Sequence, residues 1–125
     1  MPEKSIANST NPQPPTGVVV LWISGDREAA LLMALMYAKN SRLKDWWEHV
    51  RLVVWGPAAK LLSADAELQA EVGECMTAGV QVQACKACAD RYGVSADLER
   101  LGIDVLYMGE PMTAYLKDGW KVLSV

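Results

Sequence analysis

The chain has 125 residues, of which 51% are hydrophobic and 22% are charged, and this size and balance are typical of one globular domain. A formal net charge of −3 without a basic stretch argues against a nucleic-acid partner. Since the longest apolar run, residues 29–38, is shorter than the ~20 residues that cross a bilayer, we expect no membrane partner either.

Three cysteines, an odd number without regular spacing, argue against the disulfide framework of a small secreted protein. The first residues, 1–17, contain no apolar run of the kind found in a targeting signal. We therefore expect reduced thiols and a cytoplasmic location.

Residues 1–16 are rich in Ser, Asn, Gln and Pro, a composition that buries too little apolar surface to offset the entropy of ordering. We expect a flexible N-terminal tail over residues 1–16 and a single domain over residues 17–125.

The apolar pattern of this domain predicts strands that alternate with helices. The first strand is a continuous apolar run, typical of a strand covered on both faces. In the third strand apolar and polar residues alternate, so one of its faces is expected to be less completely buried. In chain order, the strands are predicted over residues 18–23, 50–55, 80–84, 104–108 and 120–125. The helices are predicted over residues 27–39, 58–62, 66–78, 86–92, 96–101 and 109–117.

Residues suited to helix ends separate these elements. Asp26 is a good N-cap for the first helix, which Asn40 is placed to end. Either Ser63 or Asp65 is suited to cap the helix over 66–78, and Ser95 is expected to cap the helix that follows it.

Short strands that alternate with helices form βαβ units, which require a parallel sheet and right-handed crossovers. The predicted fold is a three-layer α/β/α domain with a mostly parallel five-stranded sheet, flavodoxin-like in outline. Binding sites in such folds collect beyond the carboxyl ends of the strands. The substrate-binding candidates at that edge are Ser24, Gly25, Gly56, Pro57, Lys86 and Gly109.

Cys85 is the candidate catalytic residue, because it follows the third predicted strand and directly precedes a helix. The unpaired backbone N–H groups of a helix start, with Lys86 adjacent, favour a thiolate and lower the pKa of a cysteine from about 8.5 into the neutral range. The same groups would stabilise a persulfide anion. The alternative is an inert cysteine buried at a tight turn.

Cys88 completes a C-x-x-C motif with Cys85, a spacing that closes into a disulfide in thioredoxin-like proteins. It is therefore a candidate resolving cysteine, with a small core residue as the alternative. Cys75 shares a helix face with apolar residues and is expected to be structural, and His49 is expected in a loop. We expect no metal site and no cofactor, since one C-x-x-C lacks the four ligands of a zinc or iron–sulfur centre and nucleotide-binding loops are missing.

Residues 29–38 are apolar on more than the one side that a helix needs to cover a sheet. The second side requires cover, either from the segment around Trp46 and Trp47 or from another subunit. We favour a homo-oligomer.

The segments 84–94, 98–103 and 108–111 resemble the DsrE/DsrF-like family, and the resemblance extends over about residues 17–125. It implies an α/β protein that forms trimers or hexamers. The best-understood members are sulfur-relay proteins with a persulfide on one cysteine after the third strand, and the motif places that cysteine at Cys85. The additional Cys88 departs from the single-cysteine pattern.

The sequence thus favours a sulfur-relay protein, a sulfurtransferase that accepts sulfane sulfur as a persulfide on Cys85 and passes it to an acceptor thiol. Its partners would be sulfur donor and acceptor proteins or small thiols. Two alternatives stay open: an oligomeric protein that binds a ligand or partner without catalysis, and a Cys85/Cys88 redox switch.

Overall fold

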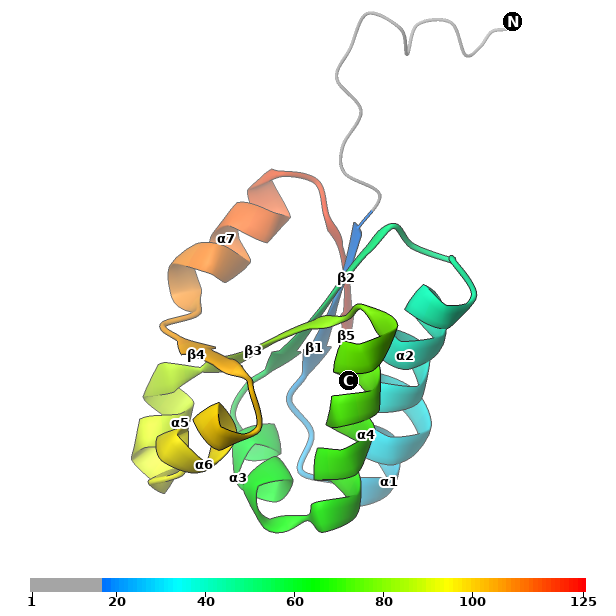
Figure 1. The fold of residues 1–125 in the computed structure, drawn as a ribbon. Helices are drawn as coiled ribbons and strands as arrows, with labels where there is room; N and C mark the ends of the chain where they lie inside the picture. Colours follow the sequence, from blue (N-terminus) through cyan, green and yellow to red (C-terminus); the bar gives the residue numbers. More distant parts are fainter. Residues whose placement is uncertain (1–16) are drawn as a thin grey trace, which may run out of the picture.

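The computed structural model describes residues 17–125, and the predicted tail over residues 1–16 lies outside the described residues. The strands form one sheet in the order β4-β3-β2-β1-β5, in which all neighbouring strands are parallel (Figure 1). The strands are β1 (Gly17–Trp22), β2 (His49–Val54), β3 (Gln81–Cys85), β4 (Asp104–Leu106) and β5 (Lys121–Ser124). The predicted parallel α/β sheet is confirmed.

The helices follow the strands in the predicted alternation. They are α1 (Arg27–Ala29), η2 (Ala30–Ala34), α2 (Leu35–Leu43), α3 (Pro57–Ala64), α4 (Ala66–Ala78), α5 (Lys86–Tyr92), α6 (Ser95–Arg100) and α7 (Gly109–Lys117). The first three form one continuous helical segment, of which η2 is a π-helical stretch.

The predicted helix ends are partly confirmed. The Asp26 carboxylate accepts hydrogen bonds from the backbone N–H groups of Glu28 and Ala29, and Asp65 caps α4 in the same way. The predicted stop at Asn40 is wrong, because the helix continues to Leu43, and the chain turns away at Asp45, which has a positive φ of 53°. The predicted cap at Ser95 is also wrong, since Ser95 is already helical and its hydroxyl bonds to Asp90 instead.

The order of the strands explains why the sheet is covered unequally. The chain moves in one direction from β1 to β4, so right-handed crossovers place the helices from α1 to α6 on one face. It then returns to the far side of β1, and this reversed crossover places α7 alone on the other face (Figure 1). The three-layer prediction is confirmed, with one thick layer and one that consists of a single helix.

Two apolar clusters fill the space between these layers. The larger one contains Val20 and Leu52 of the sheet with residues of α2, α3, α4, α5 and α6. The smaller one, which we call the α7 cluster, consists of Val19, Val53, Cys85, Met108 and Met112. Because side chains alternate along a strand, Cys85 belongs to the thinly covered face of the sheet.

Candidate functional site

Cys85 is both the last residue of β3 and the N-cap of α5. Its backbone is still extended, with φ −68° and ψ 113°, so the chain turns into the helix at the next residue. On β3, Cys85 shares a face with Gln83, and both side chains are buried on the side of the sheet that α7 covers. The predicted position at a strand-to-helix junction is what the structure shows.

The thiol of Cys88 lies against that of Cys85. The two Sγ atoms are 2.9 Å apart, and the backbone N–H of Cys88 donates a hydrogen bond to Cys85 Sγ at 3.4 Å. Residues three apart in a helical turn lie on the same side, which explains how the C-x-x-C spacing joins the sulfurs. Neither cysteine is part of a disulfide in this structure.

The electrostatics of Cys85 differ from the sequence-based expectation. Burial raises the pKa of the Cys85 thiol, and the hydrogen bond with the Cys88 thiol raises it further. The backbone N–H groups of Cys88 and Ala87 lower it, as a helix start predicts, but they are outweighed. The prediction of a lowered pKa is therefore wrong for the free dithiol, because Cys85 is only 4% exposed.

Lys86 contributes less positive charge to the thiol than its neighbouring position suggests. Its ammonium group lies 3.1 Å from the Asp90 carboxylate and 5.8 Å from the centre of the Tyr107 ring. The Ser95 hydroxyl and Lys86 together lower the pKa of Asp90, so this carboxylate stays ionised and holds the lysine charge. Lys86 is thus an ion-pair residue at the surface of α5.

The four candidates that follow β1 and β2 lie on two loops that contact each other. Ser24 Oγ accepts a hydrogen bond from the Asp26 backbone at 3.0 Å, and Ala58 N–H donates to the carbonyl of Ile23 at 3.1 Å. A Cβ atom on Gly25 would lie 3.4 Å from Cβ of Pro57. Ser24 is partly buried, and Gly25 and Pro57 are exposed, so these candidates remain accessible at the carboxyl edge of the sheet.

Gly56 and Gly109 are each next in sequence to a residue of the α7 cluster or one packed against it. Trp55, directly before Gly56, packs against the α7 cluster, as does Cys88. Gly109 begins α7 and follows Met108, a member of that cluster. A Cβ atom on Gly109 would meet no other atom within 4 Å, so the backbone there borders open space.

The sequence reasoning missed the residues that enclose Cys85. Met108 and Met112 are 1% and 8% exposed and belong to the same cluster as Cys85. Their four-residue spacing at the start of α7 is a signal for one apolar helix face. What the spacing alone does not give is the face of the sheet that α7 covers.

The sequence of this chain is similar to that of a known protein family. The model of the DsrE/DsrF-like family matches residues 19–125. The chain belongs to the DsrE/DsrF-like family. Among the curated proteins, none matches it.

Solved structures of similar proteins agree with the family assignment. A conserved protein of unknown function, BT1422 from Bacteroides thetaiotaomicron, is 35% identical, with a TM-score of 0.85 over 98% of this chain and 100% of that one. MTH1491 from Methanobacterium thermoautotrophicum, also of unknown function, is 26% identical, with a TM-score of 0.68 over 87% and 98% of the two chains. The ychN protein of E. coli shares the fold at 20% identity, with a TM-score of 0.68 over 89% and 99%.

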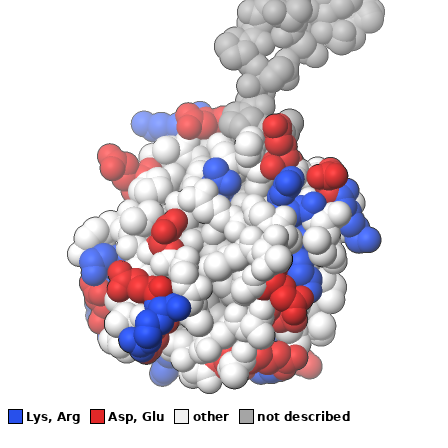
Figure 2. All heavy atoms as spheres, viewed as in Figure 1, with Lys and Arg blue, Asp and Glu red and all other residues white. Residues whose placement is uncertain are grey.

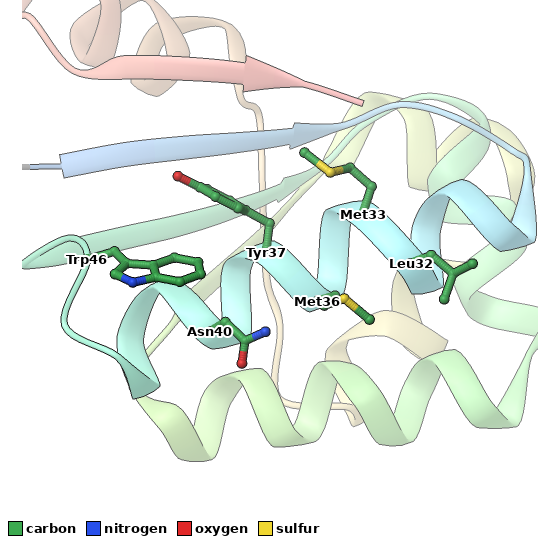
Figure 3. Close-up of a pocket in the computed structure, with 6 residues that line it drawn as sticks. All are labelled: Leu32, Met33, Met36, Tyr37, Asn40 and Trp46. Carbon is green, nitrogen blue, oxygen red and sulfur yellow. The ribbon is translucent and has the colours of Figure 1, made fainter.

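This DsrE/DsrF-like domain also carries an apolar hollow of about 160 Å³ on η2 and α2, on the opposite face of the sheet from Cys85 (Figure 3). We call it the α2 surface. Leu32, Met36 and Trp46 on this surface are 58%, 46% and 53% exposed, so burial beneath the Trp46–Trp47 segment is wrong. The residues that line the hollow are Leu32, Met33, Met36, Tyr37, Asn40 and Trp46.

Neither the charged side chains on the face drawn in Figure 2 nor the possible metal ligands of residues 17–125 indicate a separate site. Acidic and basic side chains are interspersed on the face drawn in Figure 2. Within residues 17–125, no group of three or more His, Cys, Asp or Glu side chains is arranged to hold a metal ion. No helix of the described domain has the length and apolar character needed to cross a membrane.

Proposed function

We propose that this protein is a sulfur-relay protein in which Cys85 accepts a sulfane sulfur as a persulfide and passes it to an acceptor thiol. Membership of the DsrE/DsrF-like family supports a function of this type. The observation that carries the proposal is a pair of free thiols, 2.9 Å apart, at the carboxyl end of β3. Binding sites of parallel α/β sheets collect at this edge.

Loading and delivery are two displacements at sulfur. The Cys85 thiolate attacks the outer sulfur of a donor persulfide, the donor S–S bond breaks, and the donor leaves as a thiolate. An acceptor thiolate then attacks the outer sulfur on Cys85 and takes it away, which regenerates the Cys85 thiolate. The nucleophile is the Cys85 thiolate, so loading requires that the thiol lose its proton. Because burial raises the pKa of Cys85, loading is faster at alkaline pH.

The half-buried Cys88 marks the side from which partners approach. Cys85 is only 4% exposed, whereas Cys88 retains intermediate exposure beside it. Donors and acceptors are small thiols, or proteins whose cysteine lies on a segment narrow enough to enter beside Cys88. Because the relay needs Cys85 as a free thiol, we propose a reducing, cytoplasmic compartment.

Intact-protein mass spectrometry tests the relay function. The reduced protein is mixed with glutathione persulfide and quenched with acid immediately after loading, before any later step at Cys85, and we expect a gain of one sulfur atom that peptide mapping assigns to Cys85. The matched variants are Cys85→Ser, which should not gain sulfur, and Cys75→Ser, which should load as the parent does. If Cys85→Ser loads as well as the parent, Cys85 is not the carrier.

The short distance between the sulfurs also favours a second candidate function, a thiol redox switch. Mild oxidation would then join Cys85 and Cys88 in a disulfide without any sulfur donor. Titration with diamide, followed by mapping of the disulfide, tests this function. If the protein neither gains sulfur nor forms this disulfide, both candidates fail and a binding protein without catalysis remains.

We further propose that a second copy of the chain covers the α2 surface, in a trimer or hexamer. Leu32, Met33, Met36 and Trp46 form a continuous apolar surface whose lining residues include no charged side chain. Such a surface is costly to leave in water and loses no ion pairs when it is buried.

A further inference from the structure

Resting on this proposed function, we infer that Cys88 discharges the Cys85 persulfide within the same chain, which releases hydrosulfide and leaves a Cys85–Cys88 disulfide. The site would then act on small-molecule or protein persulfides as a sulfide-releasing reductase, with an external dithiol as the second substrate.

The distance between the thiols determines which sulfur Cys88 attacks. Cys88 Sγ lies 2.9 Å from Cys85 Sγ, which becomes the inner sulfur of the persulfide. The added outer sulfur is bonded to Cys85 Sγ at about 2.05 Å, and it leaves in line with the attacking atom. Cys88 is therefore placed to displace the outer sulfur from the inner one.

The backbone holds the pair in this arrangement. The N–H of Cys88 bonds to Cys85 Sγ at 3.4 Å, so the two residues are fixed across a single helical turn. A nucleophile held in contact with its target reacts without the loss of translational freedom that an external acceptor must pay. Because Cys85 is 4% exposed, internal attack has a further advantage over an acceptor from solution.

The surroundings of Cys85 also disfavour a persistent persulfide anion. Met108 and Met112 are buried in the same cluster, and they supply no hydrogen-bond donor for a charged outer sulfur. The charged form of a sulfur group is disfavoured where apolar side chains replace water. Release as hydrosulfide moves this charge into solvent.

The step balances without an oxidant. Cys88 gives its proton to the outer sulfur, and its electron pair forms the new bond to Cys85 Sγ. The bond between Cys85 Sγ and the outer sulfur breaks, and its electron pair leaves with that sulfur as hydrosulfide. The two cysteines are oxidised to a disulfide and the sulfane sulfur is reduced. An external dithiol then reduces the Cys85–Cys88 disulfide and is itself oxidised to a disulfide.

A single-turnover experiment on the full chain tests the inference. The reduced protein is loaded with glutathione persulfide, separated at once from small molecules, and followed by sulfide assay and intact mass. We expect one sulfide per loaded chain and a Cys85–Cys88 disulfide in the parent and in Cys75→Ser. In Cys88→Ser, and in Cys88→Ala as a second variant, the added sulfur should persist and sulfide release should fall about tenfold or more.

Each other result has one meaning. If the parent keeps its added sulfur as long as the Cys88 variants do, the inference is wrong and the relay function stands. If mapping finds the sulfur on Cys88 without sulfide release, Cys88 attacks the outer sulfur, and the inference is also wrong. If neither the parent nor the Cys88 variants gain sulfur, the proposed function itself fails.

Discussion

The hydroxyl of Tyr115 in α7 donates a hydrogen bond to the side-chain oxygen of Gln83 in β3 at 2.7 Å. Gln83 is only 6% exposed and shares its face of β3 with Cys85. The bond therefore fastens α7 to the strand that carries the thiol, two residues from Cys85. It links the packing of α7 to access to the candidate site.

Tyr115→Phe should destabilise the fold by about 1–3 kcal/mol, because the buried oxygen of Gln83 loses its partner. The same change should loosen α7 and increase the rate at which iodoacetamide alkylates Cys85 in the native protein. Urea denaturation and peptide mapping measure the two effects. In a Gln83→Leu background, Tyr115→Phe should destabilise the fold less than it does in the parent, since the oxygen that would lose its partner is already removed. An unchanged alkylation rate would show that α7 does not limit access to Cys85.

Alkylation of Cys85 should rise with pH through a midpoint above the ordinary cysteine value of about 8.5. The reason is that burial and the Cys88 thiol raise the pKa of Cys85, so its neutral form persists where a free cysteine is already ionised. Cys88→Ala removes the contribution of the second thiol and should move the midpoint downward. Mapping the alkylated peptide at each pH measures it. A midpoint below that of glutathione under the same conditions would contradict this prediction.

Cys75 should make the fold sensitive to alkaline pH. Burial raises the pKa of its thiol to about 12, and its Sγ lies 3.6 Å from the Leu35 carbonyl oxygen. An unfolded cysteine loses its proton near pH 8.5, so above this pH the unfolded chain binds fewer protons than the folded one. This stabilisation is complete below pH ~8.5 and falls by up to ~1.4 kcal/mol per pH unit as the pH rises toward 12.

Cys75→Ala should therefore flatten the decline in the free energy of unfolding between pH 8.5 and 10.5, as measured by urea denaturation. The slopes are compared rather than the absolute values, because the smaller side chain also leaves a cavity. Equal slopes in the two proteins would mean that Cys75 does not titrate on unfolding in this range.

Local sequence signals predicted where Cys85 lies in the fold, but not what surrounds it. The position of Cys85 at the end of β3 followed from an alternating strand that meets a helix ended by Gly93, and both signals depend on neighbouring residues. The alternation of Val82 and Gln83 indicated that one strand face is less completely buried. Gln83 is nevertheless buried, and the Tyr115 hydroxyl donates a hydrogen bond to its side-chain oxygen. α7 covers Cys85 because of the crossover from β4 to β5, which brings distant segments together. This cover contributes to the burial that raises the pKa of Cys85.

Gly56→Ala should destabilise the fold by about 1–3 kcal/mol, because Gly56 has a φ of +63°, which residues with a Cβ atom rarely adopt. Gly109→Ala is the matched control at another glycine of the same sheet edge, where a Cβ atom meets nothing within 4 Å. Since alanine favours a helix, that control should be as stable as the parent or slightly more so. Thermal unfolding of both variants measures the difference, and equal melting temperatures would contradict the backbone argument.

Leu32→Lys should shift the protein from a trimer or hexamer to smaller species, because it places an unpaired charge on the α2 surface that a second copy is proposed to bury. Leu116→Lys in α7 is a matched control, since Leu116 is 59% exposed and Leu32 is 58% exposed, so both changes spare the core of the single chain. Light scattering coupled to size-exclusion chromatography measures the mass of each protein. A monomeric parent, or a Leu32→Lys variant that assembles as the parent does, would show that the α2 surface is not the contact between copies.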